Sequence, residues 1–469
     1  MTQLKSLVLL LISFSMQLHA MDLNNNRPPG VSYYVNVLKG DPKGDGSLKR
    51  PLRSLEAVNQ VHLLPGDRVF LAGGQLFEGT LRIHACKGTK EAPLIISSYG
   101  KGRAVIDAKM NTALTVDSSS YIQIGHLIVK GNGRLTGNDG SGIDVKYSDH
   151  ISIDDVDASG FLWNGVCTYG GNDIQLTGIY AYDNGFAGIN ITGPWSHKEV
   201  RNVTIAHCVA ENNPGNPRIK DNHSGSGILV SHSTKVLVEH CEAMNNGWDM
   251  PRPGNGPVGI WAYECDSLTI QYCYSHDNKT SAGGKDGGGF DFDGGVTNSM
   301  MQYNLSMNNE GAGYGLFQFG GASEWINNTV QYNVSIDDGK KNSQAGFFIW
   351  CDPFNKDVPL RTSDIHHNVI INRYGHSVSF ETGYSEGLLF HDNTFYLTDD
   401  GTEHIHGDYN QDGVTFKSNL YWSEKAEKEG VSQPVVKEDL EAKYKKQKFR
   451  VPSKVRLSKI KDIVDSFCR

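Results

Sequence analysis

Residues 268–273 read Leu-Thr-Ile-Gln-Tyr-Cys, residues 299–304 read Ser-Met-Met-Gln-Tyr-Asn and residues 328–333 read Asn-Thr-Val-Gln-Tyr-Asn. Each segment alternates polar and apolar residues, as a half-buried β-strand does, and ends on a small or amide residue. The same frame recurs at 203–208, 236–241, 363–368, 391–393 and 417–419. Self-similarity with a period of about 20–50 residues is typical of solenoids and other repeat proteins.

A second strand precedes this one in each repeat. Its members share a small residue followed by alternating apolar positions, and they are Ser141–Val145, Ala187–Ile191, Ser226–Val230, Val258–Ala262, Gly289–Asp293, Ala345–Ile349 and Ser377–Phe380. Repeats of this kind extend one continuous core without starting a new domain. The sequence therefore predicts an all-β chain that forms a parallel β-helix of roughly a dozen coils.

One column of residues runs through the repeats, at the end of the strands that resemble Leu268–Cys273. It reads Val156, Ile179, Cys208, Cys241, Cys273, Asn304, Asn333, Asn368, Asn393 and Asn419. In a β-helix these residues stack about 4.8 Å apart. Asparagine tolerates the left-handed geometry of bends, and its amide bonds to the same amide one coil away. Cysteine is a small apolar residue that suits the same position.

This column accounts for two features that otherwise suggest modification. Eight cysteines in an exported protein would favour disulfides, but we expect Cys208, Cys241 and Cys273 to be stacked core thiols. Asn304 and Asn333 match the N-glycosylation sequence. Their place in the column predicts buried amides that carry no glycan.

The first 20 residues have the features of a signal peptide. Lys5 supplies a positive charge, an apolar run extends from Leu7 to Phe14, and Ala20 is a small residue at the cleavage position. The run is too short to span a membrane. We therefore interpret residues 1–20 as a signal peptide and expect a secreted or periplasmic protein without a membrane span.

The mature chain divides into three predicted segments: an N-terminal cap with the first coils at 21–111, the β-helix repeats at 112–422, and a C-terminal cap at 423–469. A solenoid needs caps because its open ends expose unpaired backbone groups. In the first segment, Leu52, Leu55 and Val58 lie on one face of a predicted short helix. The last segment is rich in Lys and Glu, and Val435–Lys446 is predicted to be helical.

The N-terminal segment resembles the cap and first coils of the pectin-lyase-like superfamily. The residues that carry the resemblance are Gly44-Asp-Gly-Ser47, Pro51-Leu52, Pro65-Gly-Asp67, Ser98-Tyr-Gly100 and Val105-Ile-Asp107. Together with the repeats, the resemblance covers nearly all of the mature chain. It implies a right-handed parallel β-helix of a secreted, carbohydrate-active protein. The fold hosts lyases, hydrolases, esterases and adhesins, so the reaction depends on the site.

Composition narrows the possible partners. The formal charge is −8 and the isoelectric point is about 6.1, so the chain lacks the basic surface typical of nucleic-acid binding. We expect a monomer whose partner is a polysaccharide.

The predicted functional face is the outer side of the strands that begin each repeat, such as Gly289–Asp293. Alternation directs Phe290 and Phe292 inward and Asp291 and Asp293 outward. The same frame predicts an outward row of aromatic residues, and the predicted substrate-binding residues are Trp261, Tyr263, Phe317, Phe319, Trp350 and His223. Large exposed apolar patches usually mark a binding surface.

The predicted catalytic residues are carboxylates. Asp291 and Asp293 are two residues apart on one strand, which places their Cα atoms about 6.5–7 Å apart. That spacing is more compatible with inverting glycosidases than with retaining ones. Asp286 in the preceding loop and Glu381 three coils later are further candidates. No cofactor is expected, although paired aspartates also suit Ca²⁺.

Three functions are weighed on these residues. The first is a glycoside hydrolase acting on a plant or algal polysaccharide. The paired carboxylates favour an enzyme over a protein that only binds. The second is a pectate-type polysaccharide lyase: residues 286–290, Asp-Gly-Gly-Gly-Phe, are similar to one lyase segment, but 310–314 lack the acidic cluster expected a coil later. The third is a non-catalytic glycan-binding or adhesion solenoid.

Two adjacent histidines, His366 and His367, end another repeat strand. Neighbouring residues of a strand point to opposite faces. We therefore expect that they do not share a metal ion.

Overall fold

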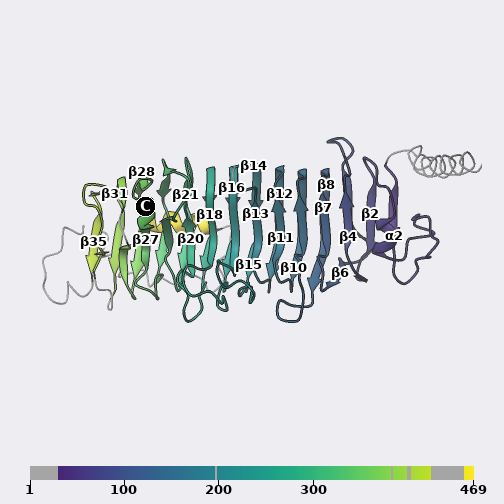
Figure 1. Cartoon of the computed structure of the whole chain (residues 1–469), viewed down its shortest axis with the longest axis horizontal. Coiled ribbons are helices and arrows are strands. Elements are labelled where there is room, and N and C mark those ends of the chain that lie inside the picture. Colours follow the sequence, from purple (N-terminus) through teal and green to yellow (C-terminus); the bar gives the residue numbers. More distant parts are fainter. Residues whose placement is uncertain (1–29, 196–197, 382–383, 399–402, 424–458, 469) are drawn as a thin grey trace, which may run out of the picture.

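The chain forms a long parallel β-solenoid of about twelve turns (Figure 1). The structure is a computed structural model, and it describes residues 30–195, 198–381, 384–398, 403–423 and 459–468. All pairings between the named strands of these ranges are parallel, and each strand pairs with its equivalent one coil away. Three sheets run the length of the solenoid, and we name them A, B and C in the order in which the chain visits them within a coil.

Sheet A contains β4 (Leu81–His84), β7 (Leu114–Asp117), β9 (Ile143–Lys146), β11 (Asn164–Tyr169), β13 (Ala187–Thr192), the first halves of β16 (Ser226–Glu239) and β18 (Val258–Gln271), β20 (Gly288–Phe292), β23 (Tyr314–Gln318), β27 (Ala345–Cys351), β30 (His376–Glu381) and β33 (Ile405–His406). Sheet B contains β1 (Ser32–Val35), β2 (Arg68–Ala72), β5 (Leu94–Tyr99), the first halves of β8 (Ser120–Gly131), β10 (Asp149–Ser159) and β12 (Asn172–Tyr182), β14 (Val200–Ala206), the second halves of β16 and β18, β21 (Met300–Gln302), β24 (Trp325–Ile326), β25 (Thr329–Gln331), β28 (Leu360–His366), β31 (Ser385–His391) and β34 (Val414–Lys417). Sheet C contains β3 (Leu76–Glu78), β6 (Ala104–Lys109), the second halves of β8, β10 and β12, β15 (Val209–Glu211), β17 (Glu242–Met244), β19 (Tyr274–His276), β22 (Leu305–Met307), β26 (Val334–Ile336), β29 (Val369–Asn372), β32 (Thr394–Leu397) and β35 (Leu420–Ser423).

The predicted column lies at the corner between sheets B and C. The amides of Asn304, Asn333, Asn368, Asn393 and Asn419 form a continuous hydrogen-bonded ladder, with donor–acceptor distances of 2.9–3.1 Å. In the coils that precede the ladder, Cys208, Cys241 and Cys273 are buried free thiols. The backbone N–H of Cys273 donates to the Asn304 amide at 3.0 Å. The interpretation of the cysteines and of the two glycosylation sequences as buried core positions is confirmed.

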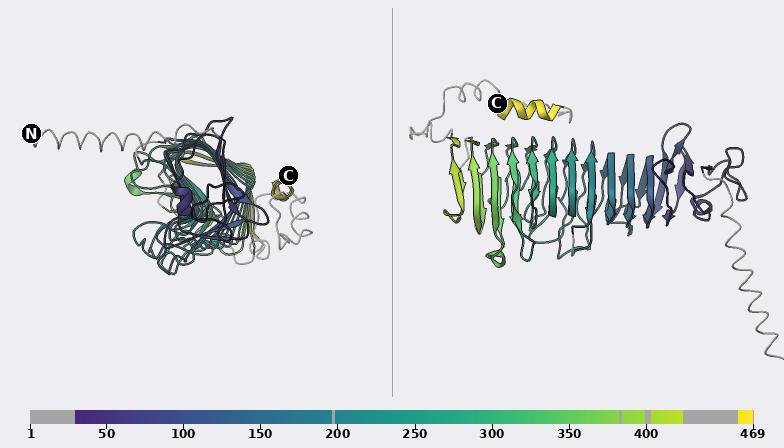
Figure 2. Two further views of the ribbon diagram at one scale, coloured as in Figure 1. Left: turned by 90° about the vertical axis from the view of Figure 1, so that its right-hand side faces the viewer. Right: turned by 90° about the horizontal axis from the view of Figure 1, so that it is seen from above.

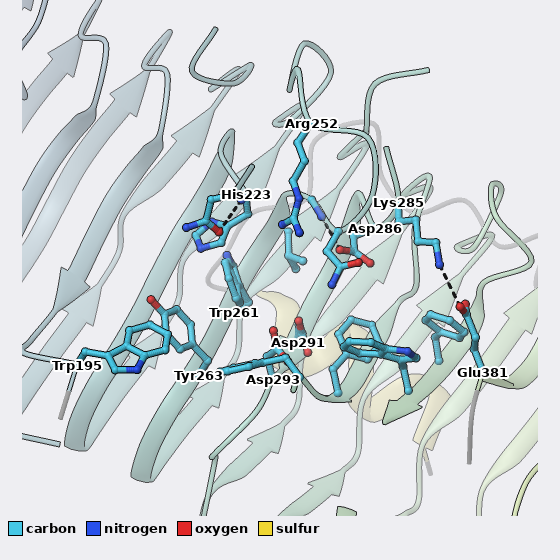
Figure 3. A pocket seen from close by; sticks show the side chains of 18 residues that line it. Trp195, His223, Arg252, Trp261, Tyr263, Lys285, Asp286, Asp291, Asp293 and Glu381 are labelled. Atoms are coloured by element: carbon cyan, nitrogen blue, oxygen red, sulfur yellow. Dashed lines mark hydrogen bonds and ion pairs between the residues drawn. The ribbon is translucent and has the colours of Figure 1, made fainter. Parts of the chain in front are cut away.

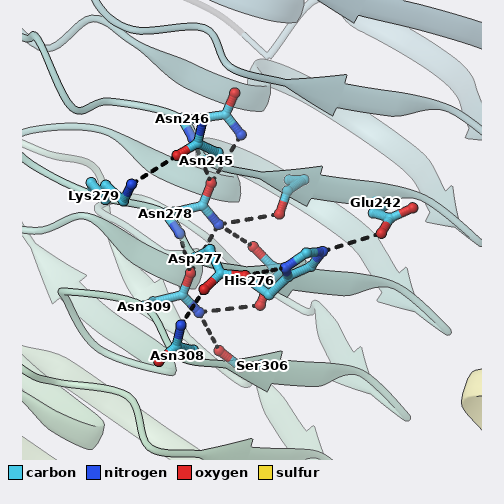
Figure 4. A network of polar contacts seen from close by, with 12 residues as sticks. Glu242, Asn245, Asn246, His276, Asp277, Asn278, Lys279, Ser306, Asn308 and Asn309 are labelled. Carbon is cyan, nitrogen blue, oxygen red and sulfur yellow. Dashed lines mark hydrogen bonds and ion pairs between the residues drawn. The ribbon is translucent and has the colours of Figure 1, made fainter. Parts of the chain in front are cut away.

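A second ladder, which we did not predict, lies at the corner between sheets C and A. Its members follow the first ladder by five residues, and they are Asn213, Asn246, Asn278, Asn309 and Asp338, preceded by Asn184. Each amide donates to the next member at 2.8–3.1 Å, as Figure 4 shows for its central part. The two ladders overlap at Asn304 with Asn309 and at Asn333 with Asp338, so these coils are fixed at two corners by the same device.

The bends differ from the prediction in one respect. The left-handed residue is the one before the ladder asparagine, for example Tyr303 (φ 53°) and His367 (φ 53°). This bend turns the chain, so consecutive side chains need not point to opposite faces. His366 and His367 accordingly lie side by side, with ring centroids 5.0 Å apart and Nδ1 atoms 2.8 Å apart. The expectation that they diverge was wrong.

The two ends are only partly described. A short helix, α2 (Leu55–Asn59), follows the N-cap Ser54 and buries Leu55 and Val58, as predicted. Its role as an end cap stays a prediction. The predicted signal peptide and the predicted helix at 435–446 lie outside the described residues.

The described C-terminal helix, α5 (Ile460–Cys468), runs beside the solenoid (Figure 2). It packs Ile460 and Val464 onto Leu305 and Val334 of sheet C. A single-turn helix, η1 (Pro353–Asn355), follows β27. Within the described ranges, no helix has the length and apolar character needed to cross a membrane.

The first ladder predicts a measurable stability effect. In an Asn333→Ala variant, the backbone N–H and the amide of Asn304 lose their acceptor, Asn333 Oδ1. Each buried polar group left without a partner costs about 1–3 kcal/mol, so chemical denaturation should show unfolding free energy lower by roughly 2 kcal/mol or more. An Asn111→Ala control at an exposed turn should change it by less than about 0.5 kcal/mol. Equal effects of the two variants would contradict the ladder's role.

Candidate active site

A cavity of about 220 Å³ opens on the outer face of sheet A. Its floor is made by β18, β20, β23, β27 and β30. Three consecutive loops that lead from sheet C into sheet A, residues 212–225, 245–257 and 277–287, form one wall. All ten predicted site residues line it, namely Asp286, Asp291, Asp293, Glu381, Trp261, Tyr263, Phe317, Phe319, Trp350 and His223 (Figure 3).

The register of sheet A explains how the floor is built. Asp291 pairs with Trp261 on one side and with Gly315 on the other, and Gly315 pairs with Phe348. A Cβ atom at Gly315 would lie 2.7 Å from the ring of Phe317 and 3.1 Å from Asp291 Oδ1. The glycine therefore leaves space beside the Asp291 carboxyl group.

Asp291 is the most enclosed of the four acids. It is 2% exposed, and its Oδ1 has no hydrogen-bond partner among the residues that the structure describes. Burial raises its pKa well above the ordinary value, and the neighbouring Asp293 and Asp286 carboxylates raise it further. Both effects favour the neutral, protonated form of the Asp291 carboxyl group.

Asp293 lies two residues further along, at the end of the same strand. Its Oδ1 accepts a 2.7 Å hydrogen bond from the backbone N–H of Gly294. Burial raises its pKa to about 7; the Gly294 bond acts in the opposite direction, and the charges of Asp286 and Glu264 add to the rise. Asp291 and Asp293 therefore form a coupled pair of buried acids whose pKa values are both raised.

The other two predicted acids are engaged by neighbouring groups. Asp286 Oδ2 accepts a 2.6 Å hydrogen bond from the backbone N–H of Gly256, which ties two wall loops together. Burial nevertheless raises its pKa. Glu381 lies at the rim, half exposed, in a 3.0 Å ion pair with Lys285 (Figure 3).

The aromatic residues divide into buried and exposed members. Trp261 and Phe317 are 4% and 7% exposed, and the Trp261 indole N–H donates to Ser226 Oγ at 3.0 Å. The most exposed ring at the cavity is Trp195, at 70%. It lies 6.1 Å from Tyr263 and 6.5 Å from Phe319, measured between ring centroids.

Sequence reasoning missed Trp195, Arg252 and Lys285. All three lie in connections between strands, where alternation gives no information about direction. Arg252 lies on the wall near His223 and Asp286 (Figure 3). Burial lowers the pKa of His223 to about 4, and the charge of Arg252 contributes to the lowering. His223 is therefore neutral at physiological pH.

Comparisons with known proteins agree with this architecture. The family model described as a right handed beta helix region matches residues 105–252 and 141–334. Residues 105–334 are a right-handed β-helix region. This confirms the fold that the resemblance implied for the repeats. No curated protein sequence matches the chain.

Several solved structures share the right-handed β-helix. The GH136 lacto-N-biosidase from Eubacterium ramulus has a TM-score of 0.58 at 20% identity, over 80% of this chain and 68% of that one. A mannuronic acid specific polysaccharide family 6 lyase from human gut microbiota has a TM-score of 0.54 at 16% identity, over 93% and 100%. The A-module of the Azotobacter vinelandii mannuronan C-5 epimerase AlgE6 has 0.51 at 14%, over 75% and 90%. At these identities the similarity shows the fold alone.

The acid pair predicts a pH-dependent stability cost. Asp293 releases its proton near pH 3.8 when unfolded and near 7 when folded, so the folded state binds more protons between these values. Stability of the wild type therefore falls as pH rises through this window. An Asp293→Asn variant lacks this titration. Its melting temperature should therefore rise relative to that of the wild type as the pH increases from about 4 to about 8.

The matched control is Asp266→Asn on sheet B. Burial of Asp266 acts to raise its pKa, but hydrogen bonds from Thr297, Asn298 and Ser267 outweigh burial and lower it. Its variant should therefore be less stable than the wild type near neutral pH, and this deficit should shrink as the pH falls through the acidic range. A difference between Asp293→Asn and the wild type that is independent of pH would contradict the raised pKa of Asp293.

Proposed function

We propose that the protein is a secreted glycoside hydrolase that cleaves a polysaccharide or a fragment of one, with Asp291 and Asp293 as its catalytic acids. The observation that carries the proposal is the enclosed carboxyl pair at the floor of an aromatic cavity. Two titratable groups with raised pKa values and different hydrogen bonding are the usual basis for separate acid and base roles. Secretion and a monomeric state remain predictions.

The environments of the two acids favour one assignment of roles. Asp291 is 2% exposed and its Oδ1 has no hydrogen-bond partner among the described residues, so it suits the general acid that donates a proton to the glycosidic oxygen as the C–O bond breaks. Asp293 Oδ1 accepts the Gly294 hydrogen bond, which favours its charged form, so Asp293 suits the carboxylate that activates water or attacks the sugar carbon. Water supplies the hydroxyl group of the released sugar.

The cavity walls favour a sugar substrate. Trp195 offers an exposed flat ring, and the rings of Tyr263 and Phe319 extend that apolar surface. Aromatic rings of this kind pack against the C–H faces of sugars, while the rim groups Glu381, Lys285 and Arg252 bind hydroxyl groups. Asp286 holds the wall loops and, in this proposal, contributes charge near the pair without contacting the reacting bond.

The lyase alternative rests on Arg252 and Lys285, because a uronate lyase needs cations that neutralise the substrate carboxylate. Two features favour the hydrolase. Lys285 is paired with Glu381, and four carboxyl groups line the cavity beside these two cations. Such a cavity is better suited to neutral sugars than to a polyuronate. A Ca²⁺ requirement, which many lyases have, stays untested and is checked by adding a chelator.

Removal of either acid should abolish turnover. Because a positioned general acid or base contributes about 10²–10⁴-fold, Asp291→Asn and Asp293→Asn should each lower kcat/KM at least about 100-fold. The substrate is first identified with a polysaccharide panel, scored for new reducing ends and for the ultraviolet absorbance of unsaturated sugars. Asp266→Asn, outside the cavity, should keep wild-type turnover.

Three outcomes would overturn the hydrolase proposal. Unchanged turnover in both aspartate variants would remove the catalytic assignment. Unsaturated products, especially if a chelator abolishes them, would assign a lyase. Glycan binding that persists without turnover on any substrate would assign the binding solenoid.

Trp195 should contribute to binding more than to chemistry. Its ring is at the rim and away from the acid pair (Figure 3), so Trp195→Ala should raise KM about tenfold with kcat nearly unchanged. Trp248→Ala is the control, because that indole is also partly exposed but contacts Arg134 and Asn212 outside the cavity. A fall in kcat without a change in KM would contradict the assignment of Trp195 as a substrate platform.

A further inference from the structure

Two columns of side chains run along the outside of sheet B and its corner with sheet C. In the first, Gln271, Gln302 and Gln331 lie in register and hydrogen-bond to one another at 2.8–2.9 Å. In the second, the rings of Tyr272, Tyr303 and Tyr332 stack, with centroids 5.1–5.5 Å apart. Both columns join coil to coil without any ligand.

Both columns change character in the same two coils. After Gln331 the first column continues as His366 and His391. After Tyr332 the second continues as His367, and the residue that follows His391 is Asp392. Asp364 lies two residues before His366 on β28, on the same outer face. Four residues of metal-binding type thus continue the amide and tyrosine columns at one place, and Asp364 lies beside them.

The donor atoms of this group converge on one point. One donor atom each of Asp364, His366 and His391 lies within 4.8 Å of the other two. Asp364 Oδ1 is 2.7 Å from His391 Nε2. On the other side of the ring, His391 Nδ1 is 2.7 Å from Asp392 Oδ2. A histidine that ligates a metal typically donates its second ring N–H to a carboxylate in this way.

We propose that Asp364, His366 and His391 bind a divalent transition-metal ion of the Zn²⁺ class, with Asp392 as the carboxylate that orients His391. The ion takes the place of the proton between Asp364 Oδ1 and His391 Nε2, and that proton is released to solvent. Water completes the coordination, since all three side chains are partly exposed.

The donor set selects the metal. Two imidazoles and one carboxylate suit Zn²⁺, Ni²⁺ or Cu²⁺, whereas Ca²⁺ and Mg²⁺ prefer oxygen donors alone. The three ligands come from β28 and β31, two neighbouring coils of sheet B. The site is therefore on a different sheet from the cavity, and the ion clamps these coils together.

Isothermal titration of the full, untagged chain with ZnCl₂ tests the proposal, after chelator treatment and buffer exchange. The wild type should bind at least one equivalent and melt at a higher temperature with Zn²⁺. His391→Asn and Asp364→Asn should each bind one equivalent fewer and lose the increase in melting temperature. Asp392→Asn should keep the equivalent but bind it about 10–100-fold more weakly. CaCl₂ should produce no such binding.

A closely matched control exists on sheet C. His276 is also held between two carboxylates, Glu242 at 3.1 Å and Asp277 at 2.7 Å (Figure 4), but its ring stacks on Tyr274 and not on a second histidine. His276→Asn should bind Zn²⁺ as the wild type does. A second cluster of possible ligands consists of His376, Glu403 and His406. The His406→Asn variant distinguishes Zn²⁺ binding by that cluster from binding by the proposed site.

The proposal is overturned if His391→Asn and Asp364→Asn retain the wild-type number of Zn²⁺ equivalents, or if His406→Asn alone removes binding. It is also overturned if the wild type binds none. Circular dichroism of each variant checks that it is folded. If His391→Asn does not fold, the near-isosteric Asp364→Asn variant provides the test. Because the metal site and the cavity lie on different sheets, glycan turnover is expected to be independent of these results.

Discussion

The side-chain amide that joins one coil to the next fixes the direction of the other side chains in the coils that it joins. Asn333 Oδ1 accepts both the backbone N–H and the amide of Asn304. A slip of one residue would break both bonds and turn every inward side chain outward. Where ladders occupy two corners, as at Asn304 and Asn309, a coil has little freedom to shift along its own path. Strict register is therefore enforced in the coil that carries β20.

Strict register is what holds the acid pair in place. Phe290 and Phe292 anchor β20 in the core, so Asp291 and Asp293 must project from the outer face. The loops at 212–225, 245–257 and 277–287 then form one wall over that face, and Asp291 is 2% exposed beneath it. The free-energy cost of placing carboxyl groups there is expressed as their raised pKa values. A rigid sheet tolerates this cost because the adjoining coils stabilise the strand.

The fold and much of the cavity could be predicted because both depend on periodicity. Alternation was enough to direct Asp291 outward, and the Asn304 column was enough to align the coils. Periodicity gives no information about loops, so Trp195, Arg252 and Lys285 were missed. It also failed at His366 and His367, because the left-handed bend at His367 reverses the usual alternation. The second ladder is equally periodic, because its members follow those of the first column by five residues.

A change of residue type within a column does not by itself indicate function, because the new side chain can take over the bonding of the one it replaces. Asp338 ends a column of asparagines, and burial raises its pKa to about 6. Its carboxyl group nevertheless accepts hydrogen bonds from Asn309 and Ser335, so it substitutes for the amide it replaces. Asp291 differs, since its Oδ1 accepts nothing from the described residues. His391 differs in another way: both of its ring nitrogens face carboxylates, and the ring of His366 lies 4.9 Å away, measured between ring centroids. Unmet bonding capacity therefore marks the acid pair, whereas a convergence of donor atoms marks the proposed metal site.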